Sequence, residues 1–415
     1  MLEIKNQIKH SLDKLEVYLD AIDLKGYDPY DALNSKMLSR LSFNNKSLKI
    51  FYTQALKRLP INLRPLLFIK RDHNAKGLGL FLAGYLKLYS LSRNEKYLKK
   101  IKYVVSILEQ IKSKGFSGYC WGYNFDWQSR DHFTPKGTPT IVNTVFIAHA
   151  FLDAYKQLGE KCYLDIARSA CDFMLNDLNI SGNDDHICFS YTPLDTFKVY
   201  NASMLGAGFL ARMYYFTREY KLLEFARKAT AYISSKQNTD GSWYYADTSH
   251  QRWIDCHHTG FVLESLFNYI KYTGDKKHLI NLEKGFEYLK AYFILPNGMT
   301  KFYHNRSCPV DIHCPSQAIV TLVKLKDIGE NSQLLQKVVG WMVDNMQDKN
   351  GYFYYRKGRF LYNKIAYIRW AQAWAFHALT TYYLYLESSL TREEKNENQY
   401  QTNKRYQKCI IFSSR

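Results

Sequence analysis

Hydrophobic and polar positions along the chain form two kinds of segment that alternate. One kind is rich in small and apolar residues at helical spacing, occurs six times, and always follows a polar or aromatic loop. The six anchors, separated by 66, 58, 56, 54 and 58 residues, are Gly77, Asn143, Asn201, His257, Asp311 and Arg369. This period fits a unit of two helices and two loops.

The second kind of segment predicts amphipathic helices with one charged face. Their apolar positions recur every three or four residues, as at Tyr103, Ile107 and Ile111. These helices are predicted at residues 95–114, 161–178, 220–236, 276–292 and 331–346. A single hairpin cannot bury its apolar faces alone, so neighbouring hairpins must stack.

The alternation predicts an all-α fold, an (α/α)6 toroid of six helical hairpins. Gly- and Ala-rich helices can approach closely at the centre, as around Gly79 and Ala373, while the charged helices form the outer wall. The first outer helix comes either from residues 2–22 or from residues 35–58. We expect residues 1–390 to form one domain, with residues 1–60 packing on the ring or completing it. Residues 391–415 are expected to form a polar, disordered tail.

The loops before the small-residue helices would gather at one mouth of such a toroid, a common place for functional residues. One long loop, residues 120–140, contains Trp121, Tyr123, Asp126, Trp127, Arg130 and His132. Its rings can stack on sugars, and Arg130 can hold a carboxylate in a bidentate manner. The alternative is a structural loop with buried aromatic rings, in which Arg130 pairs with Asp126 or Asp131.

A carboxylate, two imidazoles and an indole stand together before another small-residue helix, at Trp253, Asp255, His257 and His258. Asp255 can cap this helix, or it can form an acid–base unit with an imidazole, which titrates near neutral pH. Adjacent helical residues point about 100° apart, so one of the two histidines is expected to face the pocket.

Polar and aromatic residues also precede the last two small-residue helices. They are Asp311, His313, Tyr354, Arg369, Trp370 and Gln372. Arg369, at the start of an inner helix, requires a carboxylate or a ligand as its partner. Asp255 or Asp311 can supply this carboxylate, in which case Arg369 is structural. Asn201, at the start of an earlier helix, is interpreted as a cap.

Composition narrows the range of partners. An aromatic content of 16% with 35 Tyr fits either a Tyr-rich composition or a pocket that stacks on sugars. The net charge of +19 favours anionic partners. The chain has no nucleic-acid-binding motif, so a solvated basic surface without nucleic acid is the preferred interpretation.

Cysteine usage and hydropathy predict the cellular compartment in which the protein works. The eight Cys form no CxxC pair, the N-terminal sequence lacks a signal peptide, and no stretch of 18 apolar residues occurs. We therefore expect a cytoplasmic protein with reduced thiols and no transmembrane segment. A zinc site would have to join Cys256, His257, Cys308, His313 and Cys314. No compact ligand spacing supports such a site, so neither a metal nor a cofactor is expected.

One short motif resembles a repeat of a known enzyme family. Residues 228–243, with Gln237, Gly241 and Trp243, are similar to the QW repeat of squalene cyclases, and a weaker copy contains Gln347, Gly351 and Phe353. The resemblance implies an α/α toroid. The Asp-x-Asp-Asp acid of class II cyclases is absent from this chain, so terpenoid cyclisation is disfavoured.

A longer resemblance covers roughly residues 70–390. The stretches CWGYNFDWQSR, QNTDGSWYY, WIDCHHTGFVLESL and IRWAQAWAFHAL resemble bacterial exopolysaccharide-biosynthesis-associated proteins of the six-hairpin glycosidase-like class. This resemblance implies a toroid tied to surface polysaccharide, without assigning catalytic residues. Related toroids include hydrolases with two carboxylates. Acylglucosamine-type epimerases resemble the same ring and rely on paired histidines, an option that His257, His258 and His313 keep open.

We predict a carbohydrate-active protein of polysaccharide metabolism, acting on a neutral or anionic saccharide by acid–base chemistry of the hydrolase, lyase or epimerase type. The candidate catalytic residues are Asp126, Asp255, His257, His258 and Asp311. The candidate substrate-binding residues are Trp121, Tyr123, Trp127, Arg130, His132, Trp253, His313, Tyr354, Arg369, Trp370 and Gln372. The alternative is a non-catalytic glycan-binding or assembly protein in exopolysaccharide production. The polar loops argue against a third option, an isoprenoid-active toroid.

Overall fold

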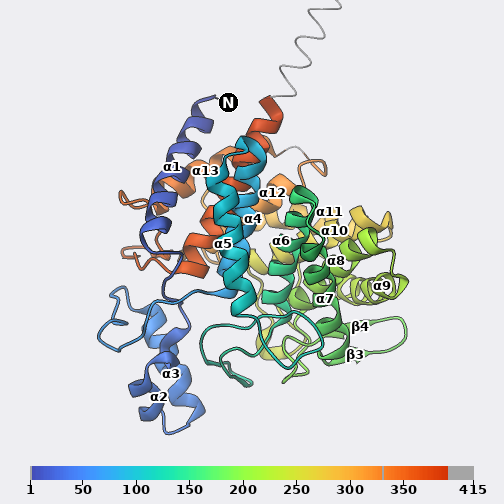
Figure 1. Ribbon diagram of the computed structural model, residues 1–415, viewed down its shortest axis with the longest axis horizontal. Coiled ribbons are helices and arrows are strands. Elements are labelled where there is room, and N and C mark those ends of the chain that lie inside the picture. Colours follow the sequence, from blue (N-terminus) through green and yellow to red (C-terminus); the bar gives the residue numbers. More distant parts are fainter. Residues whose placement is uncertain (1, 330, 391–415) are drawn as a thin grey trace, which may run out of the picture.

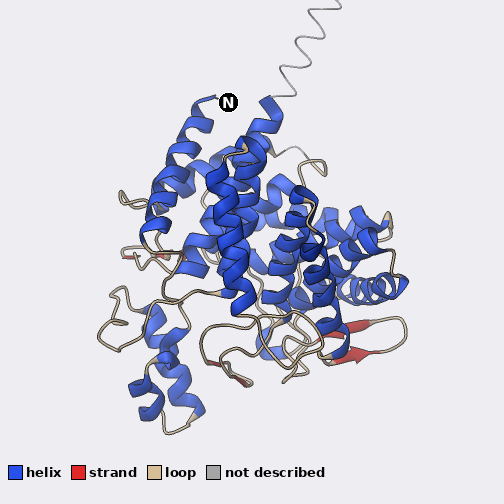
Figure 2. Cartoon of the chain, in the orientation of Figure 1, coloured by secondary structure: helices blue, strands red, loops and turns tan. Residues whose placement is uncertain are grey.

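Inner and outer helices alternate along the chain in the computed structural model, which describes residues 2–329 and 331–390 (Figures 1 and 2). The inner ring consists of α4 (Ala75–Ser92), α6 (Ile141–Leu158), α8 (Tyr200–Thr217), α10 (Cys256–Thr273), α12 (His313–Lys324) and a last helix. This last helix begins with the π-helical turn η3 (Ile368–Ala373) and continues over residues 374–390. Each of the first four inner helices packs on the next, α4 packs on η3, and the ring of His313 in α12 contacts Trp370 and Trp374 of the last helix. The predicted α/α toroid is therefore confirmed.

The outer ring consists of α5 (Glu95–Gln110), α7 (Lys161–Asn176), α9 (Tyr220–Ser235), α11 (Leu279–Phe293), α13 (Ser332–Met346) and α1 (Leu2–Ala21). Helix α1 lies between α13 and α5. On one side Gln7 donates a hydrogen bond to Asp344 at 2.9 Å, and on the other Lys96 pairs with Glu16 at 3.2 Å. Of the two segments expected to supply the first outer helix, residues 2–22 and 35–58, the N-terminal one therefore does so and completes the outer ring of six.

The other N-terminal helices form a small group that stands apart from the ring in Figure 1. They are η1 (Asp31–Asn34), α2 (Lys36–Leu41) and α3 (Lys46–Arg58). The loops also contain a short 3-10 turn, η2 (Ser249–Gln251). The predicted tail, residues 391–415, lies outside the described residues.

Short antiparallel strands form three small sheets in the loops. Strand β1 (Trp127–Gln128) pairs with β2 (Phe133–Thr134), and β3 (Ile180–Gly182) pairs with β4 (Ile187–Phe189). A third sheet has the order β5 (Val310–Asp311), β6 (Arg356–Lys357) and β7 (Tyr362–Asn363). None of the described helices combines the length and the apolar character needed to cross a membrane.

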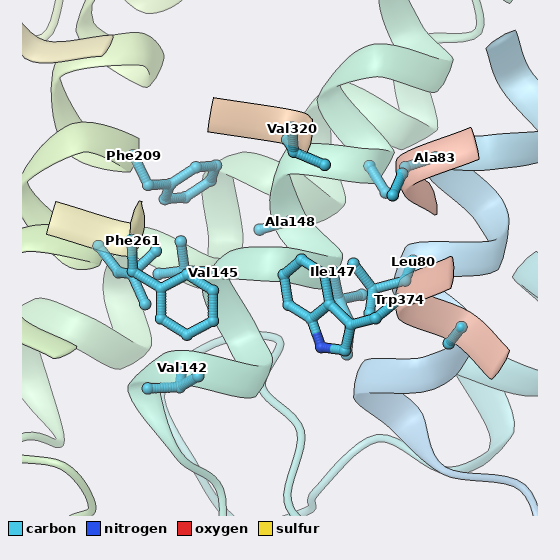
Figure 3. Close-up of a cluster of buried hydrophobic side chains, with 14 of the residues drawn as sticks. Leu80, Ala83, Val142, Val145, Ile147, Ala148, Phe209, Phe261, Val320 and Trp374 are labelled. Carbon is cyan, nitrogen blue, oxygen red and sulfur yellow. The ribbon is translucent and has the colours of Figure 1, made fainter. Parts of the chain in front are cut away.

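The core lies where the six inner helices meet. Figure 3 shows side chains from all six in one cluster, among them Leu80, Val145, Phe209, Phe261, Val320 and Trp374. Close approach of these helices requires small residues. A Cβ atom added to Gly79 would lie 2.8 Å from the Cγ1 of Ile147 on the neighbouring helix. The Gly- and Ala-rich pattern in the sequence is thus the signature of inner-ring contacts.

Side-chain caps define the N-terminal ends of several inner helices. Asn74 accepts a hydrogen bond from the backbone N–H of Gly77, and Thr140 accepts one from that of Asn143. Asp255 caps α10 in the same way. The loops that precede these caps meet at one mouth of the toroid, and the cavity described below is built there.

Candidate functional site

A cavity of about 630 Å³ opens at the N-terminal ends of the inner helices. Its walls come from the 123–132 loop, from the first turns of the inner helices and from one side of α3. Ten of the predicted site residues line it: Tyr123, Trp127, Arg130, His132, Trp253, His257, His258, His313, Arg369 and Trp370. The repeat pattern of the sequence was enough to predict this group, because every loop before an inner helix reaches the same mouth of the toroid.

Three histidine rings form a cluster in the cavity wall. The ring centroids of His257 and His258 lie 4.0 Å apart, and those of His257 and His313 lie 4.4 Å apart. Both adjacent histidines line the cavity, whereas the helical geometry predicted only one. The reason is that both rings turn toward the carboxylate of Asp255 at the start of the helix. The Nδ1 atom of His258 lies 2.7 Å from Oδ2 of Asp255, and Nδ1 of His257 lies 3.0 Å from Oδ1.

Asp255 lies behind these rings rather than in the main cavity wall, and its side chain is 1% exposed. Its carboxylate accepts hydrogen bonds from the backbone N–H of His258 at 3.0 Å and from the indole of Trp253 at 3.0 Å. Burial alone would raise the pKa of Asp255, but its electrostatic interactions with His257 and His258 and the hydrogen bond from His258 outweigh burial and hold this pKa well below its ordinary value. Asp255 is therefore an anion that both caps α10 and orients an imidazole.

His258 is held in one tautomer by this contact. Its Nδ1–H donates to Asp255, so the lone pair lies on Nε2, which has no hydrogen-bond partner among the described residues. Burial lowers the pKa of His258 to about 4, against the opposing charge of Asp255. The imidazole is therefore neutral at neutral pH. A neutral imidazole with a free Nε2 can accept a proton from a substrate.

His313 is the most deeply buried member of the cluster, with 1% of its surface exposed. Both ring nitrogens lack a hydrogen-bond partner within the described chain. Burial, with the neighbouring His257, holds the pKa of His313 well below its ordinary value. A neutral imidazole offers one N–H donor and one acceptor, and buried polar atoms of this kind normally have partners. Both nitrogens of His313 are therefore buried polar atoms without a partner in the described part of the chain.

Two lysines join the site although the sequence did not mark them as site residues. Lys76, in the first turn of α4, is 3% exposed, and its ammonium lies 4.4 Å from the ring centre of Phe146. Burial and the charge of Arg369 hold the pKa of Lys76 well below its ordinary value. Lys57 of α3 donates a hydrogen bond to the hydroxyl of Tyr30, and burial lowers its pKa to about 7. The cavity thus contains amines that lose their protons readily.

Aromatic rings form much of the remaining wall. Tyr245 and Trp253 are stacked with ring centroids 4.5 Å apart and planes at 16°. The hydroxyls of Tyr123 and Tyr191 lie 3.1 Å apart, and the ring of Trp127 contacts Tyr191. Tyr and Trp rings of this kind combine an apolar face with a polar handle, which suits a ligand that is itself amphipathic.

Arg369 has a different partner from the two that the sequence suggested. It forms a bidentate pair with Asp28 of the N-terminal segment, with Nε–Oδ2 at 2.6 Å and Nη2–Oδ1 at 2.8 Å. The guanidinium also lies over the rings of Tyr123 and Trp370, at 4.9 and 5.1 Å from their centres. Two of its nitrogens are therefore engaged by the protein itself, whereas Arg130 lines the cavity without such a pair being seen for it among the described residues.

Two residues of the 120–140 loop lie away from the cavity wall. Trp121 is fully buried, and its indole N–H donates to the carbonyl of Leu108 at 2.8 Å. Asp126 accepts the backbone N–H of Lys136 at 2.7 Å and so stabilises the loop itself. Both were expected in the pocket, but they serve the packing and the turn of the loop that carries their neighbours.

Asp311 and Tyr354 are also placed in structural contacts. Asp311 is fully buried and accepts hydrogen bonds from the Nε of Arg356 and the indole of Trp370, both at 2.7 Å. The hydroxyl of Tyr354 donates to Asp348 at 2.8 Å. Asp311 thus supports the cavity from behind by holding Trp370, instead of contacting a ligand.

Gln372 and Asn201 both differ from expectation. Gln372, expected at the binding site, has a structural contact, and Asn201, expected as a cap, lines the cavity. The side chain of Gln372 is buried and bonds both backbone groups of Phe353 at 2.8 Å, so it ties a loop to the last helix. Asn201 lines the cavity and leaves its amide nitrogen without a partner in the described chain. Val199 stands at the cap position of α8, without a side-chain hydrogen bond. A polar residue at the second position of a buried helix, after an apolar cap residue, would have been the signal for Asn201.

The ligand atoms of Asp255, His257 and His258 lie within 4.8 Å of one another, close enough for a metal ion. Asp255, however, already accepts hydrogen bonds from His258 and Trp253. Hydrogen bonding therefore accounts for the arrangement of these three groups. That no metal or cofactor is needed stays a prediction.

Several solved structures share this fold. A GH76 alpha-mannanase from Bacteroides thetaiotaomicron matches with a TM-score of 0.61 and 15% identity, over 78% of this chain and 90% of that chain. Cellobiose 2-epimerase from Bacillus thermoamylovorans matches with a TM-score of 0.60 and 10% identity, over 75% and 87% of the two chains. A D-mannose isomerase matches with a TM-score of 0.58 and 13% identity, over 76% and 87%. The sequence matches no family model and no curated protein.

Proposed function

We propose that the protein is an enzyme that moves a proton on a saccharide, at a carbon next to a carbonyl, as an epimerase or isomerase does. The observation that supports this proposal is the neutral His258, oriented by Asp255 and placed beside His257 and His313 in an aromatic cavity. Structures of similar fold include a cellobiose epimerase and a mannose isomerase, but also a mannanase. Because one fold serves several chemistries, the proposal rests on the site.

In the proposed reaction, Nε2 of His258 removes a proton from the carbon next to the carbonyl. The electron pair of the broken C–H bond forms a carbon–carbon double bond, and the carbonyl becomes an enediolate. Return of a proton to the opposite face gives an epimer, and return to the neighbouring carbon gives an isomer. The side chain of His313 lines the same cavity beside His257. The amine of Lys76, whose pKa is held well below its ordinary value, lies in the same cavity and can exchange protons with the intermediate.

The cavity is less suited to hydrolysis by two carboxylates. Such enzymes place two carboxyl groups on either side of the glycosidic bond. The described residues that line the main cavity include one carboxylate, Asp131, where such a mechanism needs two. Asp131 is also held in contacts with His250 at 2.9 Å and Gln251 at 2.6 Å. The guanidinium groups of Arg58 and Arg130 line the same cavity. These charges favour an anionic saccharide, and the resemblance noted in the sequence favours a role in polysaccharide metabolism.

A second candidate function is glycan binding without catalysis. The observation that favours it is that Asp126 and Asp311, two of the expected acids, are engaged in structural hydrogen bonds. A binding protein needs the aromatic walls but not the oriented imidazole. The two functions therefore differ in what they expect of His258, and one experiment can separate them.

The experiment uses deuterium exchange. A panel of neutral and uronic saccharides is first screened by thermal shift, because a ligand bound only by the folded protein raises its melting temperature. Each saccharide that binds is then incubated with the protein in D₂O, and incorporation of deuterium at carbon is followed by NMR. We expect exchange with wild type and, for His258→Gln, a loss of about 100-fold or more with binding retained.

The matched control is His10→Gln, on the exposed face of α1, which should exchange at the wild-type rate. Binding without exchange in wild type would make the protein a glycan-binding module. Release of shorter saccharides without exchange would instead identify a hydrolase or lyase. If none of the saccharides shifts the melting temperature, the carbohydrate proposal fails altogether.

A further inference from the structure

The segment from Lys36 to Arg71 has an unusual charge composition. It contains nine Lys and Arg residues and no Asp or Glu. Six of the nine are exposed: Lys36, Arg40, Lys46, Arg58, Lys70 and Arg71. The segment includes α2, α3 and the loop that returns the chain to the toroid. It is therefore a concentrated source of positive potential at one end of the molecule.

Large apolar side chains are exposed on the same segment. Eight of them are Met37, Leu41, Phe43, Phe51, Leu59, Ile61, Leu66 and Phe68. Two more, Phe360 and Leu361, stand on the turn between β6 and β7, next to the exposed Arg359. Half of the exposed large hydrophobic side chains of the described chain thus lie on these two short segments. Scattered apolar residues on a surface are ordinary, but a concentration of this kind marks an interaction site.

The three most exposed rings are all held at turns. Phe43, Phe68 and Phe360 are 81%, 84% and 85% exposed. Phe43 and Phe68 have φ angles of 47° and 55°, a left-handed conformation that is unusual for a bulky residue. Both rings are exposed, so packing of these side chains does not explain phenylalanine at the two turns. Such outliers point to function.

Contacts join the two segments into one surface, which we call the basic lobe: residues 36–71 with the turn 358–361. The side chain of Asn363 at the base of the turn donates to the carbonyl of Leu59 at 2.9 Å. Within the lobe, the hydroxyl of Tyr52 donates to the carbonyl of Leu41 at 3.3 Å, which joins α3 to the end of α2. The aromatic turns therefore project from connected parts of the structure.

We propose that the basic lobe docks on a lipid bilayer that carries anionic headgroups. The exposed Lys and Arg side chains would contact the headgroups, and the rings at the turns would insert at the boundary of the acyl chains. A bilayer accepts separate protruding side chains without a matching shape. Single-stranded nucleic acid would use the aromatic rings for stacking, but it would leave aliphatic tips such as Ile61, Leu66 and Leu361 without a role. Lipid is consequently the partner that explains every feature of the lobe.

The lobe also borders the cavity. One side of α3 lines the cavity through Ile50, Gln54, Lys57 and Arg58. Phe51 of the same helix is instead 63% exposed. Docking through the basic lobe would therefore hold the cavity close to the bilayer surface. This proposal stands independently of the reaction proposed above, since it rests on the outer face of α3 and on the turns.

The test is co-sedimentation with vesicles of equimolar phosphatidylglycerol and phosphatidylcholine, against vesicles of pure phosphatidylcholine. We expect wild type to bind the anionic vesicles, to bind neutral vesicles weakly, and to dissociate as salt is raised. The triple variant Phe43→Ser, Phe68→Ser and Phe360→Ser keeps every charge. Loss of the inserted rings should weaken its partitioning about tenfold or more.

The matched control replaces exposed apolar residues elsewhere, in the variant Tyr215→Ser, Tyr220→Ser and Ile280→Ser, and it should bind as wild type does. Unchanged binding by the Phe variant would show that only general charge attracts the vesicles and would overturn the proposal. Equal binding to neutral vesicles, or no binding at low salt, would also overturn it. So would a dimer that the Phe variant dissociates in size-exclusion chromatography with light scattering, because the lobe would then cover a second copy. Melting curves of both variants check that the fold is retained.

Discussion

Asp255 does two tasks with one carboxylate. It caps α10 through the backbone N–H of His258, and it orients the imidazole of the same residue. The sequence suggested a cap and an acid–base unit as alternatives, but the structure makes them compatible, since a carboxylate has two oxygens and several acceptor positions. A residue type that is common at helix caps can therefore also serve chemistry wherever the first turn of the helix carries a histidine.

The lowered pKa of His258 predicts a pH dependence of stability. The folded pKa of about 4 lies below the ordinary 6.5, so between these values the unfolded chain binds a proton that the folded protein does not. The contribution of the neutral His258 to the free energy of unfolding is therefore lost as the pH falls from 6.5 toward 4. From pH 7 to pH 5, wild type should lose about 2 kcal/mol more unfolding free energy than His258→Gln does.

Urea unfolding at the two pH values measures this difference, and comparing pH-dependent losses removes the pH-independent effect of the substitution. The exposed His10→Gln provides the control and should follow wild type. An equal loss in wild type and His258→Gln would mean that the imidazole is protonated as easily in the folded protein as in the unfolded chain. The proposed neutral base would then lose its support.

Residues of the site differ in how visible they are in the sequence. Histidine and tryptophan at helix starts are uncommon enough to be noticed, which is how His257, His258 and Trp253 were found. Lys76 was not noticed, because the chain contains 57 Lys and Arg and a buried lysine has no local mark. The pairing of Arg369 with Asp28 spans 341 positions, and no helical period predicts a contact of that kind.

At the scale of elements, the turns after the outer helices explain the resemblance to the QW repeat. The side chain of Gln237 bonds the carbonyl of Gly241 within its own turn and that of Asn281 on the next outer helix, both at 2.9 Å. Gln347 repeats this pattern and reaches Ser11 of α1 at 2.9 Å. The motif therefore fastens neighbouring outer helices, and its second copy shows that α1 occupies an outer position. Sequence could suggest the architecture through this motif because the contact itself is repeated.

Glycine at these turns is required on two grounds, which Gly351→Ala tests. Gly351 has a φ of 94°, and an added Cβ would overlap the carbonyl oxygen of Lys14 on α1. We expect Gly351→Ala to lower the free energy of unfolding by about 2 kcal/mol or more, measured by urea denaturation. The matched control is Gly340→Ala inside α13, where nothing lies within 4 Å of the added atom. It should be neutral or raise stability by up to about 1 kcal/mol. Equal effects would show that neither the backbone conformation nor the contact with α1 requires glycine at position 351.

At the scale of the whole molecule, the centre of the toroid is apolar, with polar groups at both ends. One end holds the cavity, and the middle is the cluster of Figure 3. Toward the C-terminal ends of the inner helices, charged side chains pair across helix boundaries, as Arg212 with Asp153 and Lys324 with Glu264. The sequence showed the small-residue helices but not this division, because the charges are spaced so that each helix contributes only one or two.

The toroid is closed by contacts between the two ends of the chain, and the most buried of these is the pair of Asp28 and Arg369. The side chains are 3% and 4% exposed, so neither charge is stabilised by water if the other is removed. Asp28→Asn should therefore lower the free energy of unfolding by about 3–5 kcal/mol. The double variant with Arg369→Met removes both charges and should recover part of this loss. Asp172→Asn is the control, because its pair with Arg168 is about one-third exposed on both sides, and it should cost less than about 1 kcal/mol. If Asp28→Asn proves as mild as the control, water reaches Arg369 once its partner charge is removed, and the pair is not buried in the sense that the structure indicates.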